Sequence, residues 1–143
     1  MDLSRKLGEM NFDGLIVGTN PKVQVDGKTI RKEGSAETTY KRGTIFAKSS
    51  IDGKLVILGT EAAAAVTGDG GAITTPAEEL TADCILTDDV TVGTSADVVV
   101  TAYTAGCFNA AKVIVADNYD ITEADKDALR AYGIVLKAAF GVD

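Results

Sequence analysis

The sequence contains no histidine, and this absence narrows the chemistry open to the chain. Histidine is the side chain that ordinarily changes charge near neutral pH, and it is the commonest metal ligand in proteins. Any catalysis would have to rest on carboxylates, lysine or cysteine. We therefore expect no enzyme, and we assign no catalytic residue, no metal ligand and no cofactor.

Aromatic residues are also scarce, since tryptophan is absent and the aromatic types together make up 6% of the chain. Because 45% of the residues are nevertheless apolar, the core has to be built mainly from valine, isoleucine, leucine and alanine. Side chains of this size suit thin, closely layered sheets. At 143 residues, the chain has the length of one ordinary domain.

Long apolar runs are missing as well. No stretch approaches the roughly 20 apolar residues of a membrane-spanning helix, and the charged residues 1–6 are not followed by the apolar segment of a secretory signal. We expect a soluble protein that is not exported by a signal peptide. The two cysteines, Cys84 and Cys107, lie among small apolar residues, which predicts two free, buried thiols rather than a disulfide.

Charge is present but unevenly distributed. Residues 1–50 contain nine basic and six acidic side chains, whereas residues 51–143 contain five and fifteen, and the net charge of the chain is −7. An acidic body of this kind repels nucleic acid and anionic membranes over most of its surface. We therefore expect neither nucleic acid nor membrane as a partner.

Three local patterns invite a chemical interpretation, and each has a simpler structural one. Asp88 and Asp89 are neighbours in an extended region, so their side chains point to opposite faces, and a solvated turn is expected. The glycine-rich residues 68–71 follow an alanine-rich run rather than a strand, which favours a flexible connection over a phosphate-binding loop. Cys107 has no neighbouring cation in the sequence to lower its pKa, so we do not expect a nucleophile.

Short apolar runs bounded by glycine, aspartate or asparagine predict a mainly-β protein. Residues 44–47 and 55–58 flank Asp52 and Gly53, a dipeptide that favours a tight hairpin turn. Further strands are predicted at residues 84–86, 97–103, 112–115 and 134–136.

Two segments have helical character. Residues 61–66 are rich in alanine and precede the glycine-rich connection. Residues 122–132 begin at the capping residue Thr122, carry Asp125 at the third helical position, and end at Gly133. The sequence therefore predicts one or two short helices.

The beginning of the chain differs from the rest. Leu3, Leu7 and Met10 fall at helical spacing, although so short a helix needs a partner surface. Residues 15–30 are extended, with a break at Pro21, which is typical of an edge or arm position.

A turn is predicted at Asp26 and Gly27. We expect an N-terminal arm at residues 1–39 and a compact β-rich domain at residues 40–143. We further expect residues 12–30 to become ordered only when they add to the sheet edge of another protein.

Six segments together resemble the head decoration protein D family of tailed bacteriophages, to which the phage lambda decoration protein belongs. The resemblance covers about residues 40–138, with a weaker match through residues 15–21. Residues 62–80 form a longer segment than this family usually carries. The matching segments are LIVGTNP (15–21), KRGTIFAK (41–48), DGKLV (52–56), ADCILTDDV (82–90), YTAGCFNAA (103–111) and ALRAYGIVLK (128–137).

The resemblance implies a β-clip-like fold with little helix. It implies a homotrimer at the local threefold sites of an expanded head, where it binds the major capsid protein and stabilises the shell. Such a protein is made in the host cytoplasm, lies on the outer surface of the capsid in the virion, and is a structural protein without catalysis.

The arm supplies the expected capsid contact. Two other functions stay open: another virion component, such as a tail or fibre subunit, and a small ligand-binding β module. The expected contact residues are Leu15, Ile16, Val17, Gly18, Thr19, Asn20 and Pro21.

Overall fold

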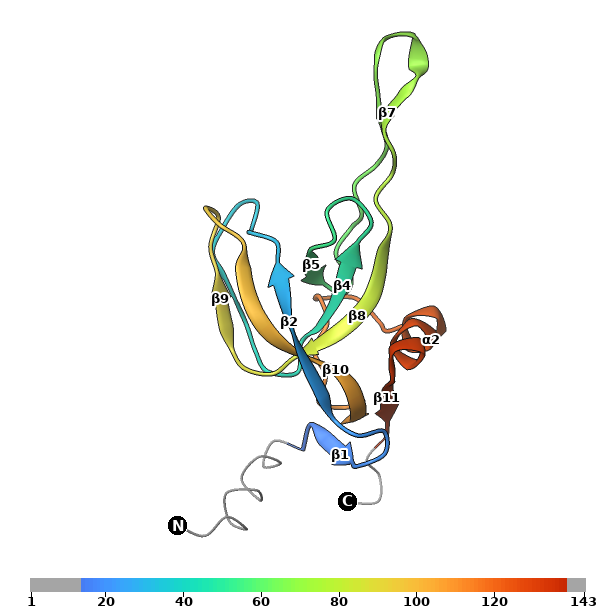
Figure 1. Cartoon of the computed structure of the whole chain (residues 1–143). Coiled ribbons are helices and arrows are strands. Elements are labelled where there is room, and N and C mark those ends of the chain that lie inside the picture. The colour runs from blue at the N-terminus through green and yellow to red at the C-terminus, as the bar shows by residue number, and fades with distance from the viewer. Residues whose placement is uncertain (1–13, 139–143) are drawn as a thin grey trace.

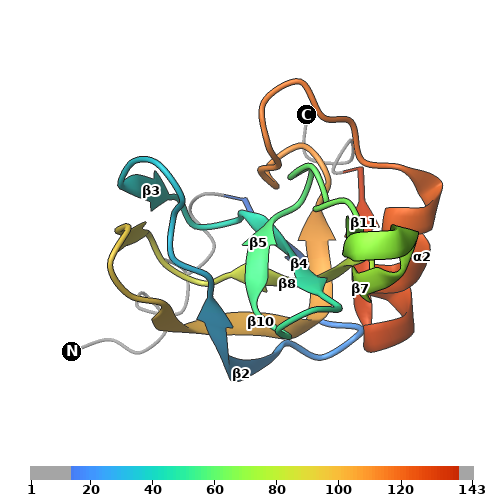
Figure 2. The ribbon, with the colours of Figure 1, turned by 90° about the horizontal axis from the view of Figure 1, so that it is seen from above.

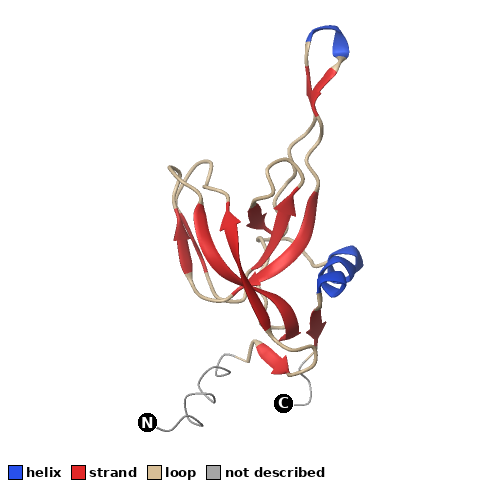
Figure 3. Ribbon diagram, viewed as in Figure 1, coloured by secondary structure: helices blue, strands red, loops and turns tan. Residues whose placement is uncertain are grey.

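One long strand, β10 (Val98–Asn109), pairs with four other strands and organises the fold (Figure 1). The computed structural model describes residues 14–138. Strands make up 43% and helix 10% of these described residues, which confirms the predicted mainly-β fold (Figure 3). The other strands are β1 (Ile16–Gly18), β2 (Gln24–Ile30), β3 (Thr38–Tyr40), β4 (Ile45–Ser49), β5 (Leu55–Ile57), β6 (Val66–Thr67), β7 (Ile73–Thr75), β8 (Leu80–Leu86), β9 (Val90–Val92) and β11 (Ile134–Lys137).

The main sheet has seven strands. Six follow the order β1-β10-β2-β5-β4-β8, β11 pairs with β10, and a further pairing joins β10 to β8. Two small antiparallel sheets, β3–β9 and β6–β7, lie outside it. Viewed from above, β2 and β10 run side by side along one flank of the body (Figure 2).

Gly106 lies where β10 changes partners. Before it, β10 pairs with β2 and β8; at and after it, β10 pairs with β1 and, in parallel, with β11. The φ of Gly106 is +147°, and a Cβ atom there would lie 2.9 Å from the ring of Phe108. Because only glycine fits this conformation and this space, the strand can bend here without displacing the core.

The predicted hairpin around Asp52 and Gly53 is confirmed. Strands β4 and β5 are antiparallel, with Ala47 opposite Val56, and Gly53 has a φ of +71°. β8 pairs with the other edge of β4, so the hairpin is part of the main sheet.

The second predicted helix is also confirmed, as α2 (Glu123–Tyr132). The Thr122 side chain accepts a hydrogen bond from the Asp125 N–H, and the Asp125 carboxylate accepts one from the Thr122 N–H, so the capping box is complete. Gly133 ends the helix with a φ of +102°. Strand β11 follows immediately. Ile134 at its start is buried, and so is Leu129 on the inner face of α2.

The core consists of two clusters. The larger lies beneath α2 and β11, and Phe108, Ile85 and Leu129 are almost completely buried in it. The smaller lies under β2, β4 and β9, where the rings of Tyr40 and Phe46 meet edge to face with centroids 5.2 Å apart. None of the helices among residues 14–138 is long and apolar enough to span a bilayer.

The expected N-terminal arm needs correction, because its described part is built into the body. β1 and β2 both pair with β10, Leu15 is 1% exposed, and Ile30 is 1% exposed. These strands pair within the chain itself and require no sheet edge of another protein. Leu3, Leu7 and Met10 lie outside the described residues.

The turn predicted at Asp26 and Gly27 is wrong, since β2 runs through both residues. Gly27 lies opposite Thr101 of β10, and continuous pairing with β10 outweighs the local turn preference. The Asp26 carboxylate instead accepts a hydrogen bond from the Gly27 N–H, at 2.8 Å.

Residues 112–115 are extended but form no regular strand. Ile114 makes one isolated parallel bridge with Thr44. The Ile114 N–H donates to the Gly43 carbonyl, and the Ile114 carbonyl accepts from the Ile45 N–H. Val113 and Val115 pack against the larger core cluster. The apolar pattern of residues 112–115 therefore reflects the burial of this segment and not the hydrogen-bonded pairing of a strand.

The helix predicted at residues 61–66 is absent, and Val66 begins the short strand β6 instead. The Thr60 hydroxyl, which would have to cap the helix, donates to the Ile57 carbonyl. The backbone of Ala63 pairs with Glu78, both as acceptor from the Glu78 N–H and as donor to the Glu78 carboxylate. A run this short has no stability as a helix unless it buries one face, and no side chain at residues 60–66 is buried.

Candidate interaction surfaces

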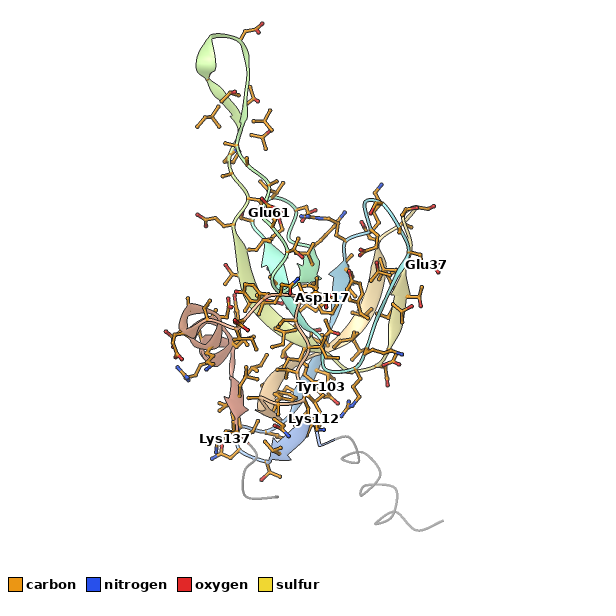
Figure 4. All side chains as sticks on the ribbon, turned by 180° about the vertical axis from the view of Figure 1, so that it is seen from behind. Glu37, Glu61, Tyr103, Lys112, Asp117 and Lys137 are labelled. Atoms are coloured by element: carbon orange, nitrogen blue, oxygen red, sulfur yellow. The ribbon has the colours of Figure 1, made fainter. Side chains whose placement is uncertain are left out.

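A narrow hairpin projects from the body between β5 and β8 (Figure 1, Figure 4). Every residue from 60 to 77 is exposed. Val66 pairs with Thr75 in β6–β7, and the 3-10 turn η1 (Asp69–Gly71) forms the tip. The figures show no other element of the body beside the tip, so its side chains are available to another molecule.

This hairpin has an unusual composition for an exposed segment of an acidic chain. Residues 62–77 contain one charged side chain, Asp69, although 24% of the whole chain is charged. Val66 is 53% and Ile73 is 65% exposed. An isolated two-stranded hairpin is marginally stable in water, and exposed apolar side chains that gather on one element are typical of a binding surface.

The base of the hairpin is held by a polar network. Arg31 makes two hydrogen bonds of 3.1 Å to the Asp52 carboxylate and one of 2.7 Å to the Glu78 carboxylate. The Ser49 hydroxyl also donates to Glu78, and the Ala63 N–H donates to the second carboxylate oxygen at 3.2 Å. The Glu78 side chain is 5% exposed, so the three donors from Arg31, Ser49 and Ala63 replace the water that its carboxylate has lost.

The same contacts determine the ionisation of Glu78. Hydrogen bonds from Ser49 and Arg31, opposed by burial and helped by the Ala63 N–H, hold the pKa of this carboxyl below its ordinary value. The Arg31 guanidinium likewise lowers the pKa of Asp52. The charged network therefore couples the foot of the hairpin to the turn between β4 and β5.

A second uncharged surface lies on the outer face of the β2–β10 ribbon, which we call the β2–β10 strip. Val99 lies opposite Thr29, and Thr101 lies opposite Gly27. Val99 is 76% and Val25 is 54% exposed. The strip consists of Val25, Gly27 and Thr29 of β2 and Val99 and Thr101 of β10.

The strip has a charged boundary. Val25 lies opposite Tyr103, and the Arg42 guanidinium lies over the Tyr103 ring at 5.5 Å from its centroid. Arg42 also donates to the Tyr103 hydroxyl and, at 3.0 Å, to the Thr87 carbonyl. Arg42 therefore places a positive charge beside the Val25 end of the strip.

The opposite face of β2 is polar and borders a shallow groove of about 270 Å³. Lys28 Nζ lies 3.3 Å from Asp83 Oδ2, and the Asp83 side chain is 5% exposed. Burial alone would lower the pKa of Lys28, but Asp83 raises it overall. This is an ion pair without good hydrogen-bond alignment, since Asp83 Oδ2 has no hydrogen-bond partner among the described residues. The groove is lined by Gln24, Asp26, Lys28, Lys48, Asp83, Thr104 and Tyr132.

The residues expected to contact a capsid do not form one surface. Leu15 belongs to the core, and Ile16, Gly18 and Pro21 are partly buried. Ile16 and Gly18 pair with β10 at Phe108 and Cys107. The exposed residues of the predicted set are Val17, Thr19 and Asn20, of which Val17 is 36% exposed.

The remaining local patterns have structural roles. Cys84 and Cys107 are free and buried, as predicted, and burial raises the pKa of the Cys84 thiol. Asp88 and Asp89 are exposed at a bend, where the Asp89 carboxylate accepts the Arg42 N–H at 2.8 Å. Within residues 14–138, no three side chains of the metal-binding types gather closely enough to hold an ion.

Sequence reasoning identified neither the hairpin nor the β2–β10 strip as a surface. The alanine-rich start of the hairpin predicted a helix, and its glycines predicted a connection. The informative signal was the scarcity of charge over residues 62–77. The strip could not be found from β2 alone, because it needs the pairing of two strands that are distant in sequence.

Comparison with known proteins adds no assignment, because neither protein-family models nor curated proteins give a match to this sequence.

Proposed function

We propose that this chain is a head decoration protein with a β-clip-like fold, which binds as a homotrimer to the outside of an expanded phage capsid. Its partner is the major capsid protein, and its function is to hold shell subunits together without catalysis. The observation that carries the proposal is the exposed hairpin at residues 62–77, which has a single charged side chain, Asp69, and is fixed at its base by the Arg31–Glu78 network.

Two further features support the proposal. The segments that resemble the decoration protein family include the β4–β5 hairpin and the α2–Gly133–β11 unit, both of which have their predicted local structure. The exposed residues Val17, Thr19 and Asn20 lie together at the β1 end of the body. We assign the capsid contact to these three residues, because the Leu15 side chain is buried in the core and is not accessible to a partner.

Stabilisation of the shell then follows from binding. A ligand that binds only the expanded shell shifts its equilibrium by RT ln(1 + [L]/Kd), about 2.7 kcal/mol per site at a hundredfold excess over Kd. Several contacts on one trimer raise the effective concentration, so weak individual contacts give durable attachment.

The test uses the purified full chain and expanded, undecorated phage heads. Sedimentation should show the chain bound to the heads, and electron microscopy should show added density at the local threefold positions. Heads that stay free of added density would overturn the proposal. A monomer whose melting temperature rises with a small-molecule ligand would favour a ligand-binding module instead.

A matched pair of variants tests the contact residues. Val17→Lys places a charge on the assigned contact, and attachment to heads should weaken by about tenfold or more, because a buried unpaired charge is costly. Thr91→Lys places the same charge on the exposed face of β9 and should attach normally. Equal attachment by both variants would contradict the assignment.

A further inference from the structure

Two exposed surfaces with little or no charge have no partner among residues 14–138, and they lie far apart on the chain. The hairpin at residues 62–77 stands away from the body, and the β2–β10 strip lies on the flank (Figure 1, Figure 2). Because both views separate them, the two surfaces cannot meet within one molecule. They can meet between two copies.

Charge favours a second copy as the occupant. Each chain carries a net charge of −7, so two copies repel each other wherever charged surfaces face. The hairpin has one charged side chain in sixteen residues, and the β2–β10 strip has none. Two copies therefore approach with least repulsion through these two surfaces.

The symmetry of a trimer also favours a second copy of the chain as the occupant. A cyclic trimer has a heterologous interface, in which one patch on each subunit contacts a different patch on the next. The chain presents one protruding and one flat uncharged surface, which are the two parts that such an interface needs. A hairpin with arms of about eight residues reaches about 26 Å, compared with a radius of gyration of about 14 Å for a domain of this size.

The expected contact between two copies is made by side chains on the face of the β2–β10 strip and not by backbone hydrogen bonds at a strand edge. β2 lies between β10 and β5 in the main sheet, with Ile30 paired to Leu55, and its Gly27 N–H donates to the Asp26 side chain at 2.8 Å. The exposed side chains Val25 and Val99 instead offer apolar contacts at the two ends of the strip, with Gly27 and Thr101 between them.

We propose that the hairpin of one copy packs with Val66 and Ile73 on the β2–β10 strip of the next copy, at Val25 and Val99, and that three such contacts close the ring. This inference rests on the homotrimer of the proposed function. It assigns the interface within the trimer and leaves the capsid contact at Val17, Thr19 and Asn20 free.

A disulfide experiment tests the pairing directly. The single variants Ile73→Cys and Val99→Cys are purified, mixed and oxidised, and a covalent dimer should form in the mixture but not in either variant alone. The double variant should yield a covalent trimer. The native thiols at Cys84 and Cys107 are buried and do not compete, which the unmodified chain verifies.

The control replaces Val99→Cys with Thr91→Cys, at an exposed position of β9. Cross-linking no stronger than in this control, in a sample that sediments as a trimer, would overturn the inference and leave the proposed function intact. A sample that sediments as a monomer would overturn both. Dimers from Ile73→Cys alone would show that two hairpins meet each other, which also contradicts the inference.

A charge variant gives a second readout. Val99→Lys should raise the dissociation constant of the trimer by about tenfold or more, while Thr91→Lys should leave it unchanged. Val99 is 76% exposed in the single chain, so folding should be unaffected, as circular dichroism can verify. An unchanged dissociation constant for Val99→Lys would contradict the pairing.

Discussion

At the scale of single residues, Gly59 occupies a position where both the backbone and the surrounding space require glycine. Its φ is +104°, and an added Cβ would lie 2.6 Å from Tyr119 Cγ and 2.9 Å from Ala116 Cβ. Tyr119 is held by its own hydroxyl, which donates to the Asp125 carboxylate of the α2 capping box. Tyr119 therefore cannot move without disturbing the start of the helix.

Gly59→Ala should therefore destabilise the fold by about 2–4 kcal/mol, because backbone strain and overpacking add. Gly70→Ala is the matched control, since Gly70 also has a positive φ, +82°, but has open space around it. Its cost should be about 1–2 kcal/mol, from the left-handed backbone alone. Urea denaturation of both variants measures the difference, and equal losses would contradict the steric explanation.

At the scale of elements, the sequence predicted best what short-range signals determine. The β4–β5 hairpin follows from Asp52 and Gly53, and α2 follows from Thr122, Asp125 and Gly133. In both cases the turn or capping residues affect backbone groups of residues only a few positions away in the sequence.

Elements that depend on distant partners were predicted less well. The turn expected at Asp26 gives way to pairing with β10, and the helix expected at residues 61–66 gives way to contacts with Glu78. Of the predicted contact residues, Leu15 lies in the core because Phe108 and other distant residues surround it. Strand pairing and burial of this kind cannot be found from local propensity.

The foot of the hairpin should respond to acid. The pKa of Glu78 is lowered in the folded protein, so its stabilising contribution is present above the ordinary glutamate pKa of 4.5 and is lost as the pH falls below it. The melting temperature should therefore decrease on acidification through this range. Asp52, whose pKa is also lowered, acts in the same direction.

Glu78→Gln tests this assignment. At neutral pH it should cost about 1–3 kcal/mol, because Arg31 and Ser49 lose a charged acceptor, and its melting temperature should depend less on pH below 4.5. Glu61→Gln, at an exposed position near the same foot, should behave like the unmodified chain. An unchanged acid response in Glu78→Gln would refute the role given to this carboxylate.

At the scale of the whole molecule, the chain combines a closely paired β body with exposed surfaces that have no partner among residues 14–138. The β strands bury two apolar clusters, whereas the hairpin and the β2–β10 strip leave valine and isoleucine exposed. Such a distribution is expected of a subunit that completes its contacts in an assembly.

Self-association is the claim on which this account depends, and sedimentation equilibrium of the full chain tests it most directly. Over a range of protein concentrations and at neutral pH, we predict a species with three times the chain mass of 14.8 kDa. A folded protein that keeps the mass of a single chain at every concentration would contradict the account.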